Sequence, residues 1–230
     1  MMHSNSKERG MTFNAEMVRA ILSGRKTQTR RIVKNQREGD CWSVKPAEVQ
    51  LCARHTHDWW LPTGTKPYSS LPACPHGNVE DRIWVRETWA EAGGNAPELQ
   101  LYRASYPDHV PSRYENLKSL EEIRWTPSIH MPRWASRILL EITNVRVERL
   151  NDISEEDAIA EGIDTDWLAE SQDNYDCIAD HNMTGRPTAK GHFSYLWQSI
   201  YGDDKSKCWE KNPWVWVIEF KRVQEQSNDQ

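Results

Sequence analysis

The sequence predicts an α+β fold, a small mixed β-barrel with helices on its outside. Predicted strands outnumber predicted helices, and the two do not alternate as they would in a doubly wound parallel sheet. The chain has 230 residues and no internal repeat, enough for one well-buried core with insertions. We therefore expect one domain over residues 11–223, with disordered polar tails at residues 1–10 and 224–230.

A short amphipathic helix is the first predicted element. Asn14 is suited to cap a helix from Ala15 to Ser23, and Gly24 is placed to end it in a left-handed conformation. The segment from Thr29 to Val33 then has the composition of a strand. A helix and a strand are thus joined by a tight turn.

Residues 35–80 are predicted to be a long irregular insertion. They are rich in Pro, Gly, Trp and His and show no clear period. Four side chains of this segment could form a zinc site, with His57 close by in sequence: Cys52, His55, Cys74 and His76. Their spacing fits no standard zinc pattern, so the favoured interpretation is a loop with free thiols, without metal or other cofactor.

The middle of the chain is predicted to be mainly strand. Residues 82–89 and 99–104 are short strand candidates, and a short helix is expected near residues 119–123. Residues 136–150 form the clearest long strand. Its alternation of apolar residues slips at Asn144, which indicates a β-bulge.

The last third of the chain is expected to contribute two helices and a closing strand. Ser154 can cap a short helix that ends at Glu161, and residues 163–190 are expected to be a second polar, irregular insertion. An apolar stripe predicts a helix over residues 192–201. Residues 214–223 then read as an apolar strand.

Composition narrows the classes of function. The net charge of −5 argues against wholesale wrapping of nucleic acid but allows a small basic site. No apolar run approaches the roughly 20 residues that span a bilayer, and residues 1–10 lack the apolar core of a signal peptide. Five irregularly spaced cysteines do not predict a disulfide framework. We expect a cytoplasmic protein without a membrane partner.

The turn after the first helix is the strongest functional signal. Six basic residues and no acidic one lie between Arg19 and Lys34. Nearby arginines should push Lys26 toward its neutral form, and a neutral lysine near the Thr29 hydroxyl could act as base for a nucleophile. The same turn could instead bind phosphate, or its charges could simply be solvated on the surface.

A second candidate site is a loop locked by two prolines. Residues 125–134 combine flat rings with a histidine and an arginine, the ingredients of a wall against which a base could stack. The residues singled out for this role are His130, Arg133 and Trp134. The alternative is a structural loop whose tryptophans plug the end of the barrel.

Several separated motifs resemble the ASCH domain family, which has a PUA-like β-barrel fold. Residues 11–223 as a whole look like the longer ASCH proteins of bacteriophages and prophages, which implies the host cytoplasm as location if the chain is phage-encoded. One departure is Glu80, where phage members usually have a glycine that serves a turn with positive φ, so we expect a rebuilt turn. The motifs that carry the resemblance are residues 24–31, 81–87, 127–138, 153–162 and 214–220.

The resemblance implies a function and the roles of several residues. Small bacterial members include amidohydrolases that remove the acetyl group from N(4)-acetylcytidine. By motif, Lys26 would be the proton acceptor, Thr29 the nucleophile and Glu161 the proton donor. Arg25, Arg30 and Arg31 would bind substrate or support the oxyanion. The alternative is a non-catalytic RNA-binding module, so the expected partner is a modified nucleoside or RNA; the oligomeric state stays open.

Overall fold

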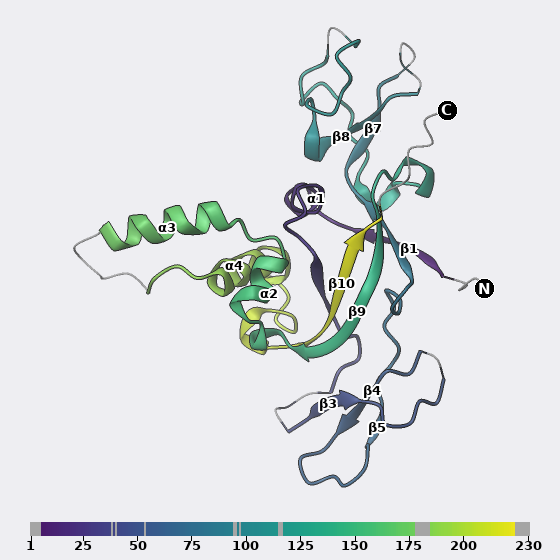
Figure 1. Ribbon diagram of the computed structural model, residues 1–230, viewed down its shortest axis with the longest axis vertical. Helices are drawn as coiled ribbons and strands as arrows, with labels where there is room; N and C mark the ends of the chain where they lie inside the picture. The colour runs from purple at the N-terminus through teal and green to yellow at the C-terminus, as the bar shows by residue number, and fades with distance from the viewer. Residues whose placement is uncertain are drawn as a thin grey trace.

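A computed structural model describes residues 6–37, 39, 41–52, 54–93, 96, 98–114, 117–177 and 185–223. The fold is α+β, as predicted. Helices pack against both faces of a central sheet, which has a small sheet at one end and a hairpin at the other (Figure 1). None of the helices in these ranges is long and apolar enough to span a lipid bilayer.

The central sheet has five strands in the order β1-β6-β9-β10-β2. β1 runs parallel to β6, and the other pairs are antiparallel, so the sheet is mixed as predicted. Within the described chain, strand pairing leaves β1 and β2 as edges instead of closing the expected ring. The strands are β1 (Glu8–Thr12), β2 (Gln28–Ile32), β6 (Arg82–Arg86), β9 (Leu139–Arg149) and β10 (Trp214–Arg222).

The prediction of a disordered tail over residues 1–10 is wrong for its second half. β1 pairs with β6 from Glu8 opposite Arg82 to Thr12 opposite Arg86. Asp81 adds to this pairing, because it accepts hydrogen bonds from the Lys7 amide at 2.9 Å and the Arg9 guanidinium at 2.7 Å. Residues 1–5 and the predicted tail at 224–230 lie outside the described residues.

Residues 35–80 are not wholly irregular as predicted. They include a three-stranded antiparallel sheet of β3 (Ser43–Pro46), β4 (His57–Trp60) and β5 (Ser69–Ser70). All four residues of β4 are buried, so the strand shows no alternation that a sequence pattern could reveal. The small sheet packs on the central one, where the Trp59 ring lies 5.7 Å from that of Trp214.

The predicted strand over residues 82–89 is divided between two sheets. β6 ends at Arg86, and β7 (Trp89–Glu91) pairs with β8 (Gln100–Tyr102) in a separate hairpin. The helix expected near residues 119–123 is wrong, because that segment contains only turns. Short 3-10 turns lie at Arg103–Ser105, Ser128–His130, Arg133–Ala135, Leu150–Asp152 and Trp209–Lys211.

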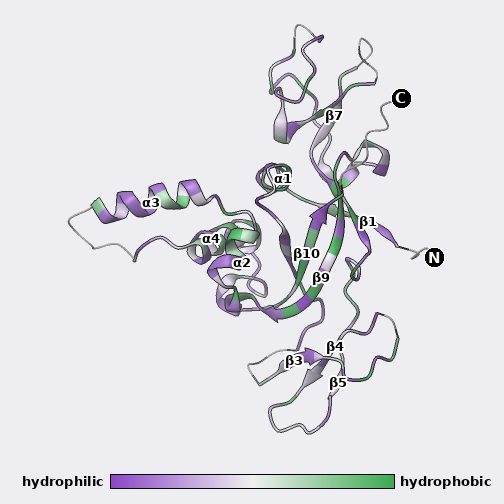
Figure 2. Ribbon diagram, in the orientation of Figure 1, coloured by the Kyte–Doolittle hydropathy of each residue, from purple (hydrophilic) through white to green (hydrophobic). Residues whose placement is uncertain are grey.

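Three predicted helices are confirmed, and one further helix was not predicted. α1 (Ala15–Leu22) has Asn14 as its cap, and Gly24 follows with a φ of 79°. α2 (Glu155–Ala160) and α4 (Ala189–Tyr201) are the other two expected helices. α3 (Thr165–Cys177) lies in the segment predicted to be irregular. It buries only Leu168, and Figure 2 shows hydrophilic residues along its length.

The two faces of β10 line two hydrophobic cores. Trp214, Trp216, Ile218 and Phe220 pack with α1 and the small sheet, whereas Val215 and Val217 face α2 and α4. This is the period of two that a strand buried on both faces produces. The predicted bulge in β9 is also confirmed, because the pairing with β10 slips opposite residues 142–144. α2 and α4 are thereby held over the strand β2, where the candidate site lies.

Candidate active site

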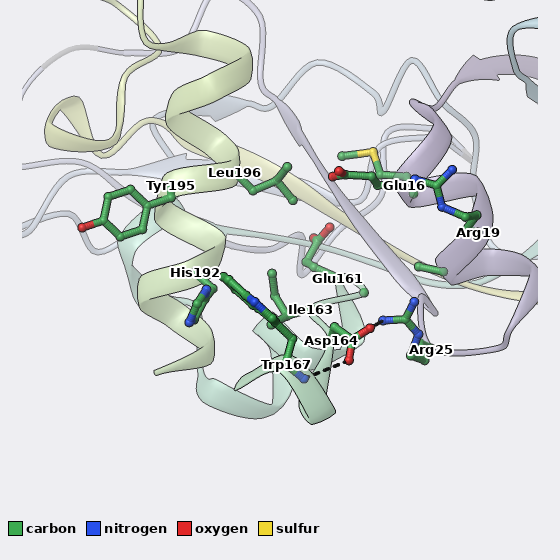
Figure 3. Close-up of a pocket in the computed structure, with 13 residues that line it drawn as sticks. Glu16, Arg19, Arg25, Glu161, Ile163, Asp164, Trp167, His192, Tyr195 and Leu196 are labelled. Carbon is green, nitrogen blue, oxygen red and sulfur yellow. Dashed lines mark hydrogen bonds and ion pairs between the residues drawn. The ribbon is translucent and has the colours of Figure 1, made fainter. Parts of the chain in front are cut away.

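A cleft of about 620 Å³ lies between α1, the end of α2, the start of α3 and α4 (Figure 3). A second, much smaller cavity of about 10 Å³, room for about one water, adjoins it. Met17, Glu161 and Leu196 line both cavities. Thr29, Arg30 and Arg31 of β2 line the small cavity.

The end of α2 fixes Glu161 at this floor. Glu161 is the C-cap of the helix, and Gly162 follows with a φ of 102°. A Cβ at Gly162 would lie 2.9 Å from the Ala20 Cβ and 3.1 Å from the Lys26 Cβ. Only glycine allows both this backbone conformation and this close approach of α2 to α1. The Thr27 amide also donates to the Ala160 carbonyl at 2.9 Å, which joins the two segments directly.

Lys26 and Glu161 form a buried ion pair. Lys26 Nζ donates at 2.7 Å to Glu161 Oε2 and at 2.7 Å to the Glu161 backbone carbonyl. The two side chains are 0% and 2% exposed. Burial lowers the pKa of Lys26, and the Glu161 carboxylate opposes that shift. The arginines that the sequence suggested as the cause, Arg30 and Arg31, lower this pKa only as minor contributors.

Arg30 is bound by protein carboxylates, although it also lines the small cavity. Its side chain is fully buried and donates to Glu161 at 3.1 Å, to Asp157 at 2.8 Å and to Glu148 at 2.5 Å. Arg146 contacts the last two carboxylates from the other side. Arg30 is therefore enclosed by protein carboxylates, and its contact with Glu161 Oε1 fixes the carboxylate that Lys26 also binds.

Thr29 lies close to this pair but is not bonded to it. Its residue on β2 is opposite Ile218 and is only 1% exposed. Within the described chain, the hydrogen bonds of Lys26 Nζ go to Glu161, and none joins it to the Thr29 hydroxyl. Thr29 and Glu161 instead meet as lining residues of the small cavity.

The other two predicted arginines lie at the two ends of the site. Arg25 lines the mouth of the cleft and forms an ion pair with Asp164 at 2.8 Å, drawn dashed in Figure 3. Arg31 lines the small cavity, donates to the Thr12 carbonyl at 2.9 Å and has its guanidinium 5.2 Å from the centre of the Phe13 ring. Arg31 thus links β2 to the end of β1.

The proline-locked loop does not contribute to this site, which corrects a prediction. His130, Arg133 and Trp134 are absent from the lining of both cavities. Arg133 forms an ion pair with Glu8 at 2.8 Å, and the Trp134 ring lies edge-on to Trp89 at 5.3 Å. The loop packs near β1 and the β7–β8 hairpin, because Met131 and Ala135 form a buried cluster with Trp89 and Tyr102 of the hairpin.

Aromatic residues that the sequence did not single out form one wall of the cleft. Trp167 of α3 lies edge-on to His192 of α4, with ring centres 4.2 Å apart, and Tyr195 extends the wall (Figure 3). Burial lowers the pKa of His192. His192 and Tyr195 lie on the polar side of the helix predicted over residues 192–201, and that helix could have identified them as candidates. The sequence offered no such signal for Trp167, because its helix was not predicted.

The four zinc candidates are not assembled into a site. His55 Nε2 bonds to Asp58 Oδ1 at 2.7 Å, Cys52 is exposed, and Cys74 is buried with the pKa of its thiol raised by burial. Burial lowers the pKa of His76 to about 4. In the ranges that the structure describes, no three His, Cys, Asp or Glu side chains are grouped to hold a metal ion.

Comparison with known proteins adds little. No protein-family model matches the sequence, and no curated protein matches it. One solved structure is similar, the crystal structure of protein EF3133 from Enterococcus faecalis V583, assigned to the family DUF984. The two chains are 11% identical, the match covers 99% of this chain and 86% of that one, and the TM-score is 0.36. At that score the likeness supports no inference about this protein.

Proposed function

We propose that this protein is an amidohydrolase that removes the acyl group from an N(4)-acylated cytidine, as N(4)-acetylcytidine to cytidine and acetate. One observation supports it above all: the Lys26–Glu161 pair lies buried at the floor of a cleft of about 620 Å³. That volume is within the roughly 300–1,000 Å³ typical of small-molecule sites. Under this proposal the sheet is an open form of the PUA-like barrel, with Arg31 bridging its edges.

The buried pair supplies a base and an acid together. Transfer of one proton across 2.7 Å, from Lys26 Nζ to Glu161 Oε2, leaves a neutral amine beside a carboxylic acid. Burial favours that neutral form over two separate charges. Arg30, bonded to the other carboxylate oxygen, favours return of the proton to the lysine after each turnover.

Thr29 is the proposed nucleophile. Its oxygen attacks the acyl carbon while Lys26 takes the hydroxyl proton, and Arg31, from the same small cavity, is the cation available to the developing oxyanion. Glu161 then gives its proton to the N4 nitrogen as the carbon–nitrogen bond breaks and cytidine leaves. The proton on Lys26 then passes to Glu161, so that Lys26 is neutral again and can deprotonate a water that attacks the threonine ester. As the ester bond breaks, Lys26 returns this proton to the Thr29 oxygen, and acetic acid leaves and ionises to acetate.

The aromatic wall of the cleft is suited to the pyrimidine. Trp167, His192 and Tyr195 offer flat surfaces in the cleft beside the Arg25–Asp164 pair, where the Trp167 amide donates to Asp164 at 3.3 Å. Stacking on such a surface contributes about 1–3 kcal/mol per base. The base would thus be held in the wide part of the cleft with its acylated amine toward Glu161.

The test is incubation with N(4)-acetylcytidine, with cytidine release followed by chromatography. Thr29→Val removes the hydroxyl with little change of shape, and Thr29→Ser retains it as the matched control. We expect turnover by the native protein and by the serine variant, and none by the valine variant. Absence of turnover by the native protein, or full activity of folded Thr29→Val, would refute the proposal.

The competing function is a non-catalytic RNA-binding module. That function relied on Arg30 and Arg31 as phosphate ligands, and Arg30 is enclosed by three carboxylates. The RNA-binding function would therefore depend on Arg31 as its phosphate ligand. It predicts no turnover of any acylated cytidine, together with a salt-dependent RNA affinity that Arg31→Ala weakens.

A further inference from the structure

A separate, basic cavity lies at the C-terminal end of β2. It measures about 930 Å³ and is bounded by residues 32–37 and 39 on one side and by residues between 205 and 213 on the other. Arg31 lines the active-site cavity, and the next residue of β2, Ile32, lines this one. The two sites share no lining residue.

The charge of this basic groove contrasts with the net charge of −5 of the whole chain. Glu210 is the one acidic residue among its described lining residues. Glu38 and Asp40, neighbours in sequence, lie outside the described residues. Its six basic residues are Lys34, Arg37, Arg149, Lys205, Lys207 and Lys211.

The basic side chains divide into fixed and available ones. Arg149 donates to the Asn212 carbonyl at 3.1 Å and to the Gly39 carbonyl at 3.0 Å, so it ties the two walls together. Lys207 is paired with Asp204. Lys34, Lys205 and Lys211 are exposed, and none forms an ion pair with a residue that the structure describes.

Flat rings adjoin the groove at Arg37. The Arg37 guanidinium lies 4.6 Å from the centre of the Trp42 ring and 4.5 Å from that of Tyr68. Arg37 also lines a neighbouring hollow of about 440 Å³, together with Trp42 and Trp59. Tyr68 is 56% exposed. Cationic side chains that continue into stacked aromatic rings are the pattern of proteins that bind single-stranded nucleic acid.

We propose that this groove binds the phosphodiester backbone of single-stranded nucleic acid. Lys34, Lys205 and Lys211 contact successive phosphates, and the Arg37–Trp42–Tyr68 stack receives a neighbouring base. Charge alone would equally suit an acidic peptide, but an acidic peptide has no base to stack on the exposed Tyr68 ring beside Arg37. The inference does not depend on the amidohydrolase proposal, because it uses none of the residues of the cleft.

The test measures the binding of fluorescein-labelled oligouridylate and oligothymidylate to the full-length protein by fluorescence anisotropy, from 50 to 300 mM salt. The variant Lys34→Ala/Lys205→Ala/Lys211→Ala removes three cations from the groove. Its control, Lys7→Ala/Lys118→Ala/Lys221→Ala, removes three exposed cations elsewhere and has the same net charge. Circular dichroism checks that both variants fold.

Three phosphate contacts at about 0.7 counterions each make log affinity fall with log salt by about 2 units per decade. The groove variant should therefore bind about 100-fold more weakly at 0.1 M salt, with a slope smaller by about 2, while the control binds as the native protein does. RNA and DNA should bind similarly if the backbone is the shared determinant. Equal weakening by the control variant, equal binding of polyglutamate, or no binding of either oligonucleotide would overturn the proposal.

Discussion

Lys26→Met tests how far the buried ion pair stabilises the fold. Methionine fills a similar volume without charge, so the substitution leaves the Glu161 carboxylate buried with Arg30 as its remaining cationic partner. Removing one member of a buried pair usually costs about 3–5 kcal/mol. Since Arg30 still binds Oε1, we expect the lower end, about 3 kcal/mol of unfolding free energy.

The matched comparison removes the second charge as well. In Lys26→Met/Glu161→Leu both members become apolar, and Arg30 keeps Asp157 and Glu148 as partners. Replacing a whole buried pair with apolar side chains is often neutral or stabilising. The double variant should therefore be more stable than Lys26→Met alone, which urea unfolding at pH 7 measures through the midpoint. A double variant less stable than Lys26→Met would refute the reasoning.

The same pair predicts a pH dependence. Burial lowers the pKa of Lys26 below its usual value of 10.5, so over that interval the unfolded chain binds the proton that the folded chain has released. Stability must then rise with pH up to about 10.5 as far as this group contributes. Lys26→Met lacks the contribution, so its stability should rise less than that of the native protein as the pH approaches 10.5. Identical pH profiles for the two proteins would contradict the assigned burial.

Three further substitutions test other features. Gly162→Ala should destabilise by about 1–3 kcal/mol more than Gly93→Ala, because both glycines have positive φ but only the first would bring a Cβ against Ala20; equal losses of melting temperature would contradict this. Glu80→Gly should stabilise by roughly 1 kcal/mol, since Glu80 has a φ of 71°, whereas Glu80→Ala should give no gain in the same urea titration. His76 has a pKa lowered to about 4, so between pH 6.5 and 4 the unfolded chain binds a proton that the folded chain does not. The native protein should therefore lose roughly 2–3 kcal/mol of unfolding free energy over this interval, and His76→Gln should not. An equal loss of stability in His76→Gln as the pH falls would disprove this prediction.

Elements with local signals could be predicted from the sequence. The side chain of Asn14 accepts a hydrogen bond from the Met17 amide, and that of Ser154 accepts one from the Asp157 amide, as their spacing indicated. Gly24 has the left-handed conformation expected of a helix end. At position 80 the resemblance correctly indicated a backbone with positive φ, but the expected loss of that conformation without glycine did not occur. The turn keeps its positive φ with a glutamate in place of glycine, instead of being rebuilt.

Elements that depend on distant partners could not be predicted. β1 is a strand because its residues pair with β6, more than 70 positions away, and nothing in its own composition distinguishes it from a polar tail. α3 is polar on nearly every side, with Leu168 as its one buried residue, so it lacks the stripe that identifies a helix. The strands of the small sheet are too short or too fully buried to alternate.

The candidate site shows the same division. Lys26 and Glu161 lie 135 positions apart, and only the resemblance suggested that they belong together. The sequence could not predict the environment of Arg30, because its carboxylate partners lie more than 100 positions away, on β9 and on α2 with its C-cap. The predicted base-binding loop had suitable residue types, but the contact of Trp134 with Trp89 holds it at the hairpin and away from the cleft.

The parallel pairing of β1 bears on how the protein can be handled. Trimming the first twelve residues as if they were a dispensable leader would strip the backbone groups of β6 of their hydrogen-bond partners from Arg82 to Arg86. An uncovered strand of this kind recruits strands from neighbouring molecules and promotes aggregation. Shortened versions for crystallisation should therefore begin no later than Lys7, whose amide still reaches Asp81.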